Sequence, residues 1–174
     1  EVERKNALFG AAMDAFEAAR QAGKIRFIGF SAHSVEAALA MLDRFAFDSI
    51  LFPVNFATWH AGGFGPSVLE KAAMQQVGVL ALKAMAKGPW PDGAPRDHPK
   101  CWYQPLSDPE EARLGLAFTL SHPVTAAIPP GDEKLFRLAL QLAADFKPLT
   151  SEESLRIKQM ARAGKPIFRY PQWS

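Results

Sequence analysis

The sequence has a single cysteine, Cys101, and no long uninterrupted hydrophobic run. One cysteine excludes an intrachain disulfide framework and any cysteine-based metal or iron–sulfur site within these residues, and we expect no metal site. A reducing, cytoplasmic location is the default expectation for such a chain. No apolar run approaches the roughly 20 residues that a membrane-spanning helix needs, so we expect no membrane partner.

An excess of charge is absent as well. The formal net charge of the 174 residues is +2, and 22% of them are charged. No basic stripe forms and the aromatic residues do not alternate with cations, which argues against nucleic acid as a partner. Neither an initiator methionine nor a signal peptide precedes the first predicted helix, so we expect the sequence to begin inside a longer chain.

The chain contains instead an alternation of apolar runs and amphipathic segments, and 48% of its residues are hydrophobic. The apolar runs that we predict as strands are 25–31, 48–54, 77–83 and 124–128. Helices are predicted at 2–22, 34–42, 66–73, 108–121, 132–145 and 150–161. Ser34 is predicted as the N-cap of the second helix, and Thr150 and Glu153 have the spacing of a capping box at the start of the last. This order is typical of an α/β protein with a parallel sheet covered by helices.

Two further segments are predicted as loops. Residues 55–65 are rich in glycine and aromatic residues, and residues 88–106 contain five prolines. A loop as long as the second one is usually functional or disordered. We expect its aromatic side chains to anchor it on the rim of the sheet, with a substrate lid as the alternative.

Read in order, the ends of the predicted strands resemble strands five to eight of an aldo/keto reductase. The segments that carry this resemblance are GKIRFIGFS at 23–31, PVN at 53–55, LALKAMAKG at 80–88 and AIPPG at 127–131. The resemblance covers nearly the whole chain. Each motif alone is only moderately specific, whereas all of them in sequence make a strong pattern.

The resemblance implies a fold. The family forms a TIM (β/α)8 barrel, which typically needs about 250 residues. We therefore expect an α/β fold that is the C-terminal half of such a barrel. Residues 1–174 would form the C-terminal part of a single barrel, with 147–174 as its C-terminal helix and tail.

The resemblance also implies a function, that of an NAD(P)-dependent oxidoreductase. Such an enzyme reduces aldehydes or ketones, or oxidises alcohols, by hydride transfer. The family's catalytic Asp, Tyr, Lys and His lie on its first four strands and their loops. We therefore expect no catalytic residue in this chain and no reductase activity from residues 1–174 alone.

The cofactor-binding residues implied by the resemblance lie at the strand ends. Ser31 and Asn55 correspond to positions that bond the nicotinamide carboxamide; a helix-entry cap and a turn-satisfying Asn are the respective alternatives. Lys83 is expected to reach a pyrophosphate or a substrate, or else to be a solvated lysine. His33 follows the fifth strand rather than the fourth, so we expect a structural or substrate-facing role for it.

The adenosine phosphates of NADP or NAD are expected near Pro129 and Gly131, with Lys134 and Arg137 as the available cations. A loop that feeds a helix N-terminus suits an anion. Alternatively, both cations face solvent. Many family members have a Lys-Ser pair where this chain has Pro130 and Gly131, so the choice between NAD and NADP stays open.

The expected partners are the nicotinamide cofactor and a small carbonyl substrate. Four parallel strands from an opened barrel would also leave two bare edges. A missing N-terminal half-barrel or self-association would have to cover them. The alternative function is therefore a non-catalytic half-barrel that binds a nucleotide or serves in assembly.

Overall fold

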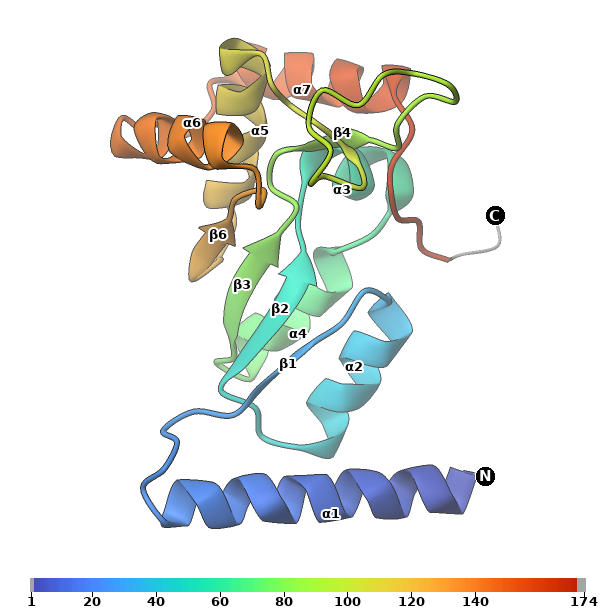
Figure 1. Cartoon of the computed structure of the whole chain (residues 1–174), viewed down its shortest axis with the longest axis vertical. Coiled ribbons are helices and arrows are strands. Elements are labelled where there is room, and N and C mark those ends of the chain that lie inside the picture. Colours follow the sequence, from blue (N-terminus) through green and yellow to red (C-terminus); the bar gives the residue numbers. More distant parts are fainter. Residues whose placement is uncertain (1, 172–174) are drawn as a thin grey trace.

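The structure, a computed structural model, describes residues 2–171, with side chains from residue 8 onwards (Figure 1). In chain order its elements are α1 (Val2–Gln21), β1 (Gly29–Ser31), α2 (Val35–Arg44), β2 (Ser49–Pro53), α3 (Phe56–Gly62), α4 (Pro66–Met74), β3 (Gly78–Leu82), β4 (Ala86–Gly88), β5 (Gln104–Pro105), α5 (Pro109–Leu120), β6 (Ala126–Ile128), α6 (Glu133–Ala144) and α7 (Ser151–Ala163).

The central sheet has four strands in the order β1-β2-β3-β6, and all neighbouring pairs are parallel. The register pairs Ser31 with Leu51, and Pro53 with Leu82. Leu82 in turn lies opposite Ile128. The predicted α/β fold with four parallel strands is confirmed.

One hydrophobic core lies between the sheet and the helices α2 and α4. Ile50 and Phe52 are two residues apart on β2, so both side chains point to the same face, and both are fully buried. They pack in one cluster with Ala38 of α2 and Val68 of α4. The apolar composition of β2 is therefore explained by its burial in this core.

A second core joins α3, α5, α6 and α7. Its buried members include Phe56, Leu114, Phe118, Leu135 and Ile157, which come from these four helices. In Figure 1 these helices gather at the end of the molecule opposite α1. The chain thus places one core along the sheet and another above its carboxyl ends.

The two helices α5 and α7 begin at well-formed caps. Asp108 Oδ1 accepts hydrogen bonds from the backbone N–H groups of Glu110 and Glu111, at 3.0 and 2.9 Å. Thr150 and Glu153 form the predicted capping box, in which each side chain accepts from the backbone N–H of the other, at 3.2 and 2.8 Å. These caps satisfy N–H groups that have no partner within the helix.

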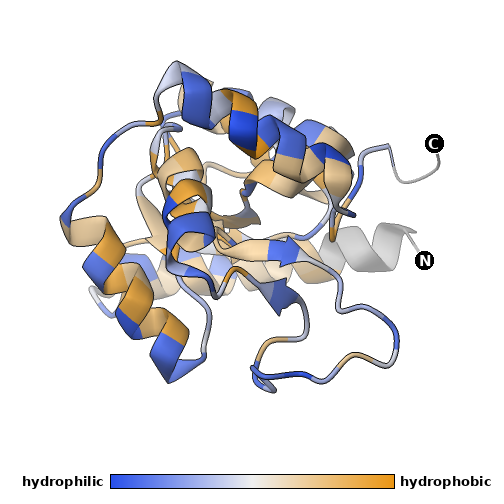
Figure 2. Cartoon of the chain, turned by 90° about the horizontal axis from the view of Figure 1, so that it is seen from above, coloured by the Kyte–Doolittle hydropathy of each residue, from blue (hydrophilic) through white to orange (hydrophobic). Residues whose placement is uncertain are grey.

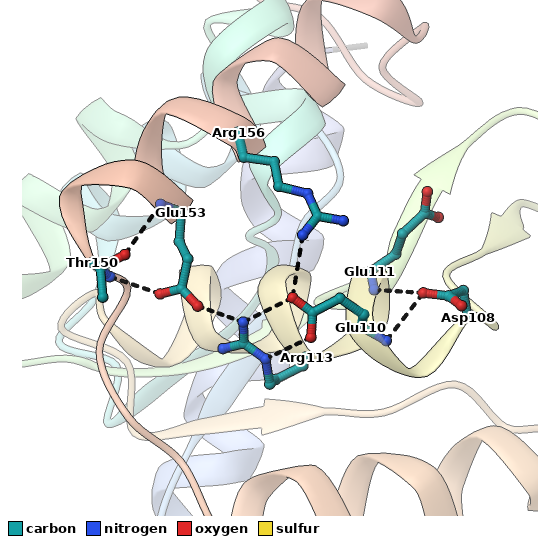
Figure 3. A network of polar contacts seen from close by, with 7 residues as sticks. All are labelled: Asp108, Glu110, Glu111, Arg113, Thr150, Glu153 and Arg156. Atoms are coloured by element: carbon teal, nitrogen blue, oxygen red, sulfur yellow. Dashed lines mark hydrogen bonds and ion pairs between the residues drawn. The ribbon is translucent and has the colours of Figure 1, made fainter.

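A charged network ties the first turns of these helices together (Figure 3). Arg113 of α5 binds Glu110 on its own helix at 3.0 Å and also contacts Glu153 of α7. Arg156 of α7 lies 3.3 Å from the same Glu110. The network is largely exposed, so its main effect is to fix the relative orientation of the two helix ends.

Three predicted elements differ from the structure. Residues 55–65, predicted as a loop, contain the helix α3, which ends at Gly63 in the left-handed region (φ 60°). The predicted loop 88–106 is bounded by the antiparallel pair of β4 and β5. The strand predicted over 25–31 is regular only from Gly29 to Ser31.

Large apolar side chains are exposed at both ends of the chain. Leu8, Phe16 and Phe27 are exposed on α1 and on the segment leading to β1, and Phe136 and Leu140 are exposed on α6. Figure 2 shows strongly hydrophobic residues among hydrophilic ones along α6. Among the described residues, no helix has the length and apolar character needed to cross a membrane.

Candidate functional site

The predicted site residues gather where the strands of the sheet end. Ser31 is the last residue of β1, and Asn55 follows β2 by two residues. Lys83 directly follows β3, and Pro129 directly follows β6. Because the strands are parallel and in register, these four residues lie along the edge of the sheet that is formed by the carboxyl ends of its strands. Parallel α/β folds bind ligands at this carboxyl-terminal edge.

Asn55 is fully buried and caps α3. Its Oδ1 accepts a hydrogen bond from the backbone N–H of Thr58 at 3.0 Å, while Thr58 Oγ1 donates to the Asn55 carbonyl at 3.1 Å. Asn55 therefore has the role given above as its alternative, that of satisfying the backbone at a turn. It uses only the amide oxygen, however, since Nδ2 is buried with no hydrogen-bond partner among the described residues.

Ser31 and His33 are both exposed beside the end of β1. The helix-entry cap that was the alternative role for Ser31 belongs to Ser34, whose Oγ accepts from the backbone N–H of Ala37 at 3.1 Å. The Ser31 hydroxyl is therefore not used to begin α2. The His33 ring lies 5.8 Å from the ring of Phe168, which fits a structural loop residue.

Lys83 occupies an unusual backbone conformation, with φ at 66°. Its ammonium lies 5.4 Å from the centre of the Trp102 ring and 5.1 Å from that of Tyr103, a distance at which cations are attracted to aromatic faces. Partial burial lowers the pKa of Lys83, and the nearby Cys101 thiol acts in the opposite direction. Lys83 is thus a positioned cation and not a freely solvated one.

A pocket of about 100 Å³ lies beside Lys83, between the end of β3 and the 129–131 loop. Cys101 and Tyr103 line it, and burial raises the pKa of both side chains, so thiol and phenol stay protonated at neutral pH. The Trp90 indole donates to the Cys101 carbonyl at 2.8 Å. These contacts anchor the long loop on the rim of the sheet, as its aromatic content predicted.

The backbone N–H groups at the N-terminus of α6, where a phosphate was predicted, bind the carboxylate of Asp132. Asp132 Oδ1 accepts from the backbone N–H groups of Lys134 and Leu135, at 3.1 and 3.2 Å. Arg137 pairs with Glu133 at 2.9 Å, and both side chains are about three-quarters exposed, at 73% and 75%. The predicted phosphate region therefore presents a self-capped helix and a solvent-facing ion pair.

The segment after α7 crosses the same edge of the sheet, which sequence reasoning missed. The Tyr170 N–H donates to the Gly62 carbonyl at 2.7 Å, and the Phe168 ring stacks on Phe64 with centroids 5.2 Å apart. Trp102 of the long loop contacts Phe168 edge-on at 6.1 Å. The local signal for this placement is weak: Phe168 and Tyr170 flank one polar residue, Arg169, in an otherwise apolar segment.

Comparison with known proteins addresses the fold directly. No family model matches the sequence, and no match was found among curated proteins. Among solved structures, the holo form of the aldo-keto reductase AKR11C1 from Bacillus halodurans is similar, with a TM-score of 0.60 and 19% identity over 91% of this chain. The chain has the fold of part of an aldo-keto reductase barrel.

The apo form of the same Bacillus halodurans enzyme gives a TM-score of 0.57 at 20% identity, again over 91% of this chain. The matches cover only 55% and 58% of those enzymes, so this chain spans little more than half their length. The resemblance found in the sequence is confirmed at the level of the fold, including the partial barrel. Within the described residues, no group of three or more His, Cys, Asp or Glu is arranged to hold a metal ion.

Proposed function

We propose that this chain forms the cofactor-binding half of an NAD(P)-dependent oxidoreductase that interconverts carbonyl compounds and alcohols. The observation that carries the proposal is the placement of Ser31, Asn55 and Lys83 along one edge of a parallel sheet. The similarity to aldo-keto reductases, whose structures include a holo form, supports the same reading.

The donors at this edge suit the amide end of a nicotinamide cofactor. A carboxamide has one acceptor oxygen and two N–H donors. The buried Asn55 Nδ2 lacks an acceptor, and the exposed Ser31 hydroxyl both donates and accepts. When bound, the cofactor supplies or takes up the hydride, while these side chains fix the orientation of its ring.

Lys83 is the best-supported group for the charged part of the cofactor or for a polar substrate. Its ammonium is held near Trp102 and Tyr103, so little side-chain freedom remains to be lost when an anion binds. Lys134 and Arg137 remain predicted contacts to the adenosine phosphates, beside Pro129 and Gly131. Arg137 would have to leave Glu133 to bind a phosphate, whereas Lys134 would not need to break this ion pair.

Titration of NADPH and NADH, followed by cofactor fluorescence, tests the binding proposal. Asn55→Ser keeps an oxygen for capping α3 but removes the unpartnered amide donor. We expect about a tenfold weaker Kd, the loss typical of one hydrogen bond to a buried group. Ser31→Ala should also weaken binding, whereas Ser67→Ala on α4 is the matched control and should not. Equal affinities for all three variants and the parent would contradict the proposal.

A second assay tests the division between binding and chemistry. We infer that the catalytic groups belong to a partner half-barrel, which would also cover the exposed edges at β1 and β6. Residues 1–174 alone should therefore leave NADPH unoxidised in the presence of small aldehydes. Turnover by this segment would refute that inference. A natural full-length protein that binds NADPH and never oxidises it would instead identify a non-catalytic binding module.

A further inference from the structure

A second pocket lies away from the strand ends, among α3, α5 and α7. Its volume is about 280 Å³, near the lower end of the range for small-molecule sites. Its walls include the polar side chains His60, His122 and Lys158 together with the apolar side chains Phe118, Leu149 and Ile157. None of these residues takes part in the proposed nicotinamide site.

The orientation of His122 is fixed by its surroundings. Its Nδ1 lies 2.8 Å from the Phe118 carbonyl, and because a carbonyl only accepts, Nδ1 must carry the proton. The ring is also held 4.3 Å from Trp59 and 4.5 Å from Phe118, measured between centroids. Nε2 is therefore the accepting nitrogen of the neutral ring, so His122 lines the pocket without donating to a carboxylate.

The electrostatic surroundings of the pocket are positive. Burial lowers the pKa of His60, and the charges of Lys158, His122 and Arg162 lower it further, without a compensating carboxylate. Lys158 and Arg162 form no ion pair within the part of the chain that the structure describes. These cations disfavour a metal ion at the two histidines and favour an anion.

We propose that this pocket binds a small organic carboxylate with an apolar body. The carboxylate end is placed at Lys158 and at the protonated His60 ring, where it neutralises charge that forms no ion pair within the described residues. The apolar body lies against Phe118 and Ile157, which removes hydrophobic surface from water. This site is independent of the nicotinamide site and does not depend on the chain being part of an oxidoreductase.

The proposal implies a particular dependence on pH. A bound anion favours the protonated form of His60, while the facing groups Lys158, His122 and Arg162 oppose it. Affinity should therefore rise as the pH falls below 6.5, the ordinary pKa of histidine, because the pKa of His60 is lowered in the free protein; a neutral ligand should show no such rise.

Benzoate and its neutral relative benzyl alcohol are suitable probes, titrated into the natural full-length protein and followed by the NMR signals of the histidine rings. We expect saturable shifts at His60 and His122 with benzoate, at a Kd in the region of about 1 mM. Benzyl alcohol should bind at least about tenfold more weakly, because it lacks the charge that Lys158 meets.

Lys158→Gln should weaken benzoate binding about five- to tenfold, since one charge-assisted contact is lost. Lys147→Gln removes an exposed lysine outside this pocket and should leave the Kd unchanged. The proposal is overturned by any of three results: no saturable shift at about 10 mM benzoate, equal binding of the alcohol, or an unchanged Kd in Lys158→Gln.

Discussion

The replacement of Gly62 by alanine tests how the C-terminal tail is held. Gly62 is the last residue of α3, and a Cβ added there would lie 2.4 Å from the Phe168 carbonyl oxygen. The Phe168 carbonyl carbon and the Pro166 Cβ would both be 3.5 Å away. The nearest obstacle is backbone, so the added methyl group has no flexible side chain to displace, and the tail must move.

The expected cost follows from the contacts that hold the tail. Moving it weakens the hydrogen bond from Tyr170 to Gly62, worth about 1 kcal/mol, and the stacking of Phe168 on Phe64, worth about another 1 kcal/mol. Alanine is a better helix former than glycine by up to about 1 kcal/mol. Because the displaced tail relieves the overlap, no further packing cost is added, and we expect a net loss of about 1–2 kcal/mol in the free energy of unfolding.

Urea unfolding of Gly62→Ala beside Gly10→Ala measures this difference. Gly10 lies inside α1 with no atom within 4 Å of an added Cβ, so its replacement should stabilise by up to about 1 kcal/mol. Trypsin should also cut Gly62→Ala faster after Arg169, which lies in the displaced tail; the Lys165–Pro166 bond resists trypsin in both proteins. If Gly62→Ala is as stable as Gly10→Ala, or its tail is cut no faster than the parent's, the close approach is not what fixes the tail.

Three further changes follow from local contacts. Thr150→Ala should lower the free energy of unfolding by about 1 kcal/mol, because it removes one half of the capping box, whereas Thr150→Ser should preserve it; urea titration distinguishes the two. The parent should lose stability as the pH falls below 6.5, because the unfolded state then takes up a proton that the half-buried His60 resists. His60→Gln should lose less between pH 7 and pH 5.5, and an identical loss would contradict the burial argument. Arg113→Gln should cost no more than about 1 kcal/mol, and the difference from the parent should shrink in 1 M salt; a difference that persists there would show a role beyond exposed ion pairing.

The sequence predicted the elements whose causes are local. Ser34 and Thr150 were recognised as helix caps from a few neighbouring residues, and both accept the expected hydrogen bonds. The apolar runs that became β2 and β3 were predicted to within two residues at each end, because neither face of these strands is fully exposed and both faces therefore carry apolar residues. The positions of Ser31, Asn55 and Lys83 at one edge of the sheet follow from those runs and from the parallel order.

Other features were missed because they depend on distant contacts or because a local pattern had two interpretations. The short helix α3 was predicted as a loop because Gly63 and Gly65 dominate its end, although Asn55 is a good cap in hindsight. The pairing of β4 with β5 and the path of the tail over Gly62 bring together residues that no local window contains. The self-capping of α6 by Asp132 was likewise hidden, since the same loop pattern also suits a phosphate.

The position of Lys83 beside Trp102 also affects the fluorescence of that tryptophan. Trp102 fluoresces, and its emission depends on charges close to the indole. Because the Lys83 ammonium lies 5.4 Å from its ring, the emission of Trp102 reports the position of this cation. An anion that draws the Lys83 ammonium away would alter that emission without any added label. Trp102→Phe would keep a ring for the cation and silence the signal, so the response of this edge can be separated from the rest of the chain.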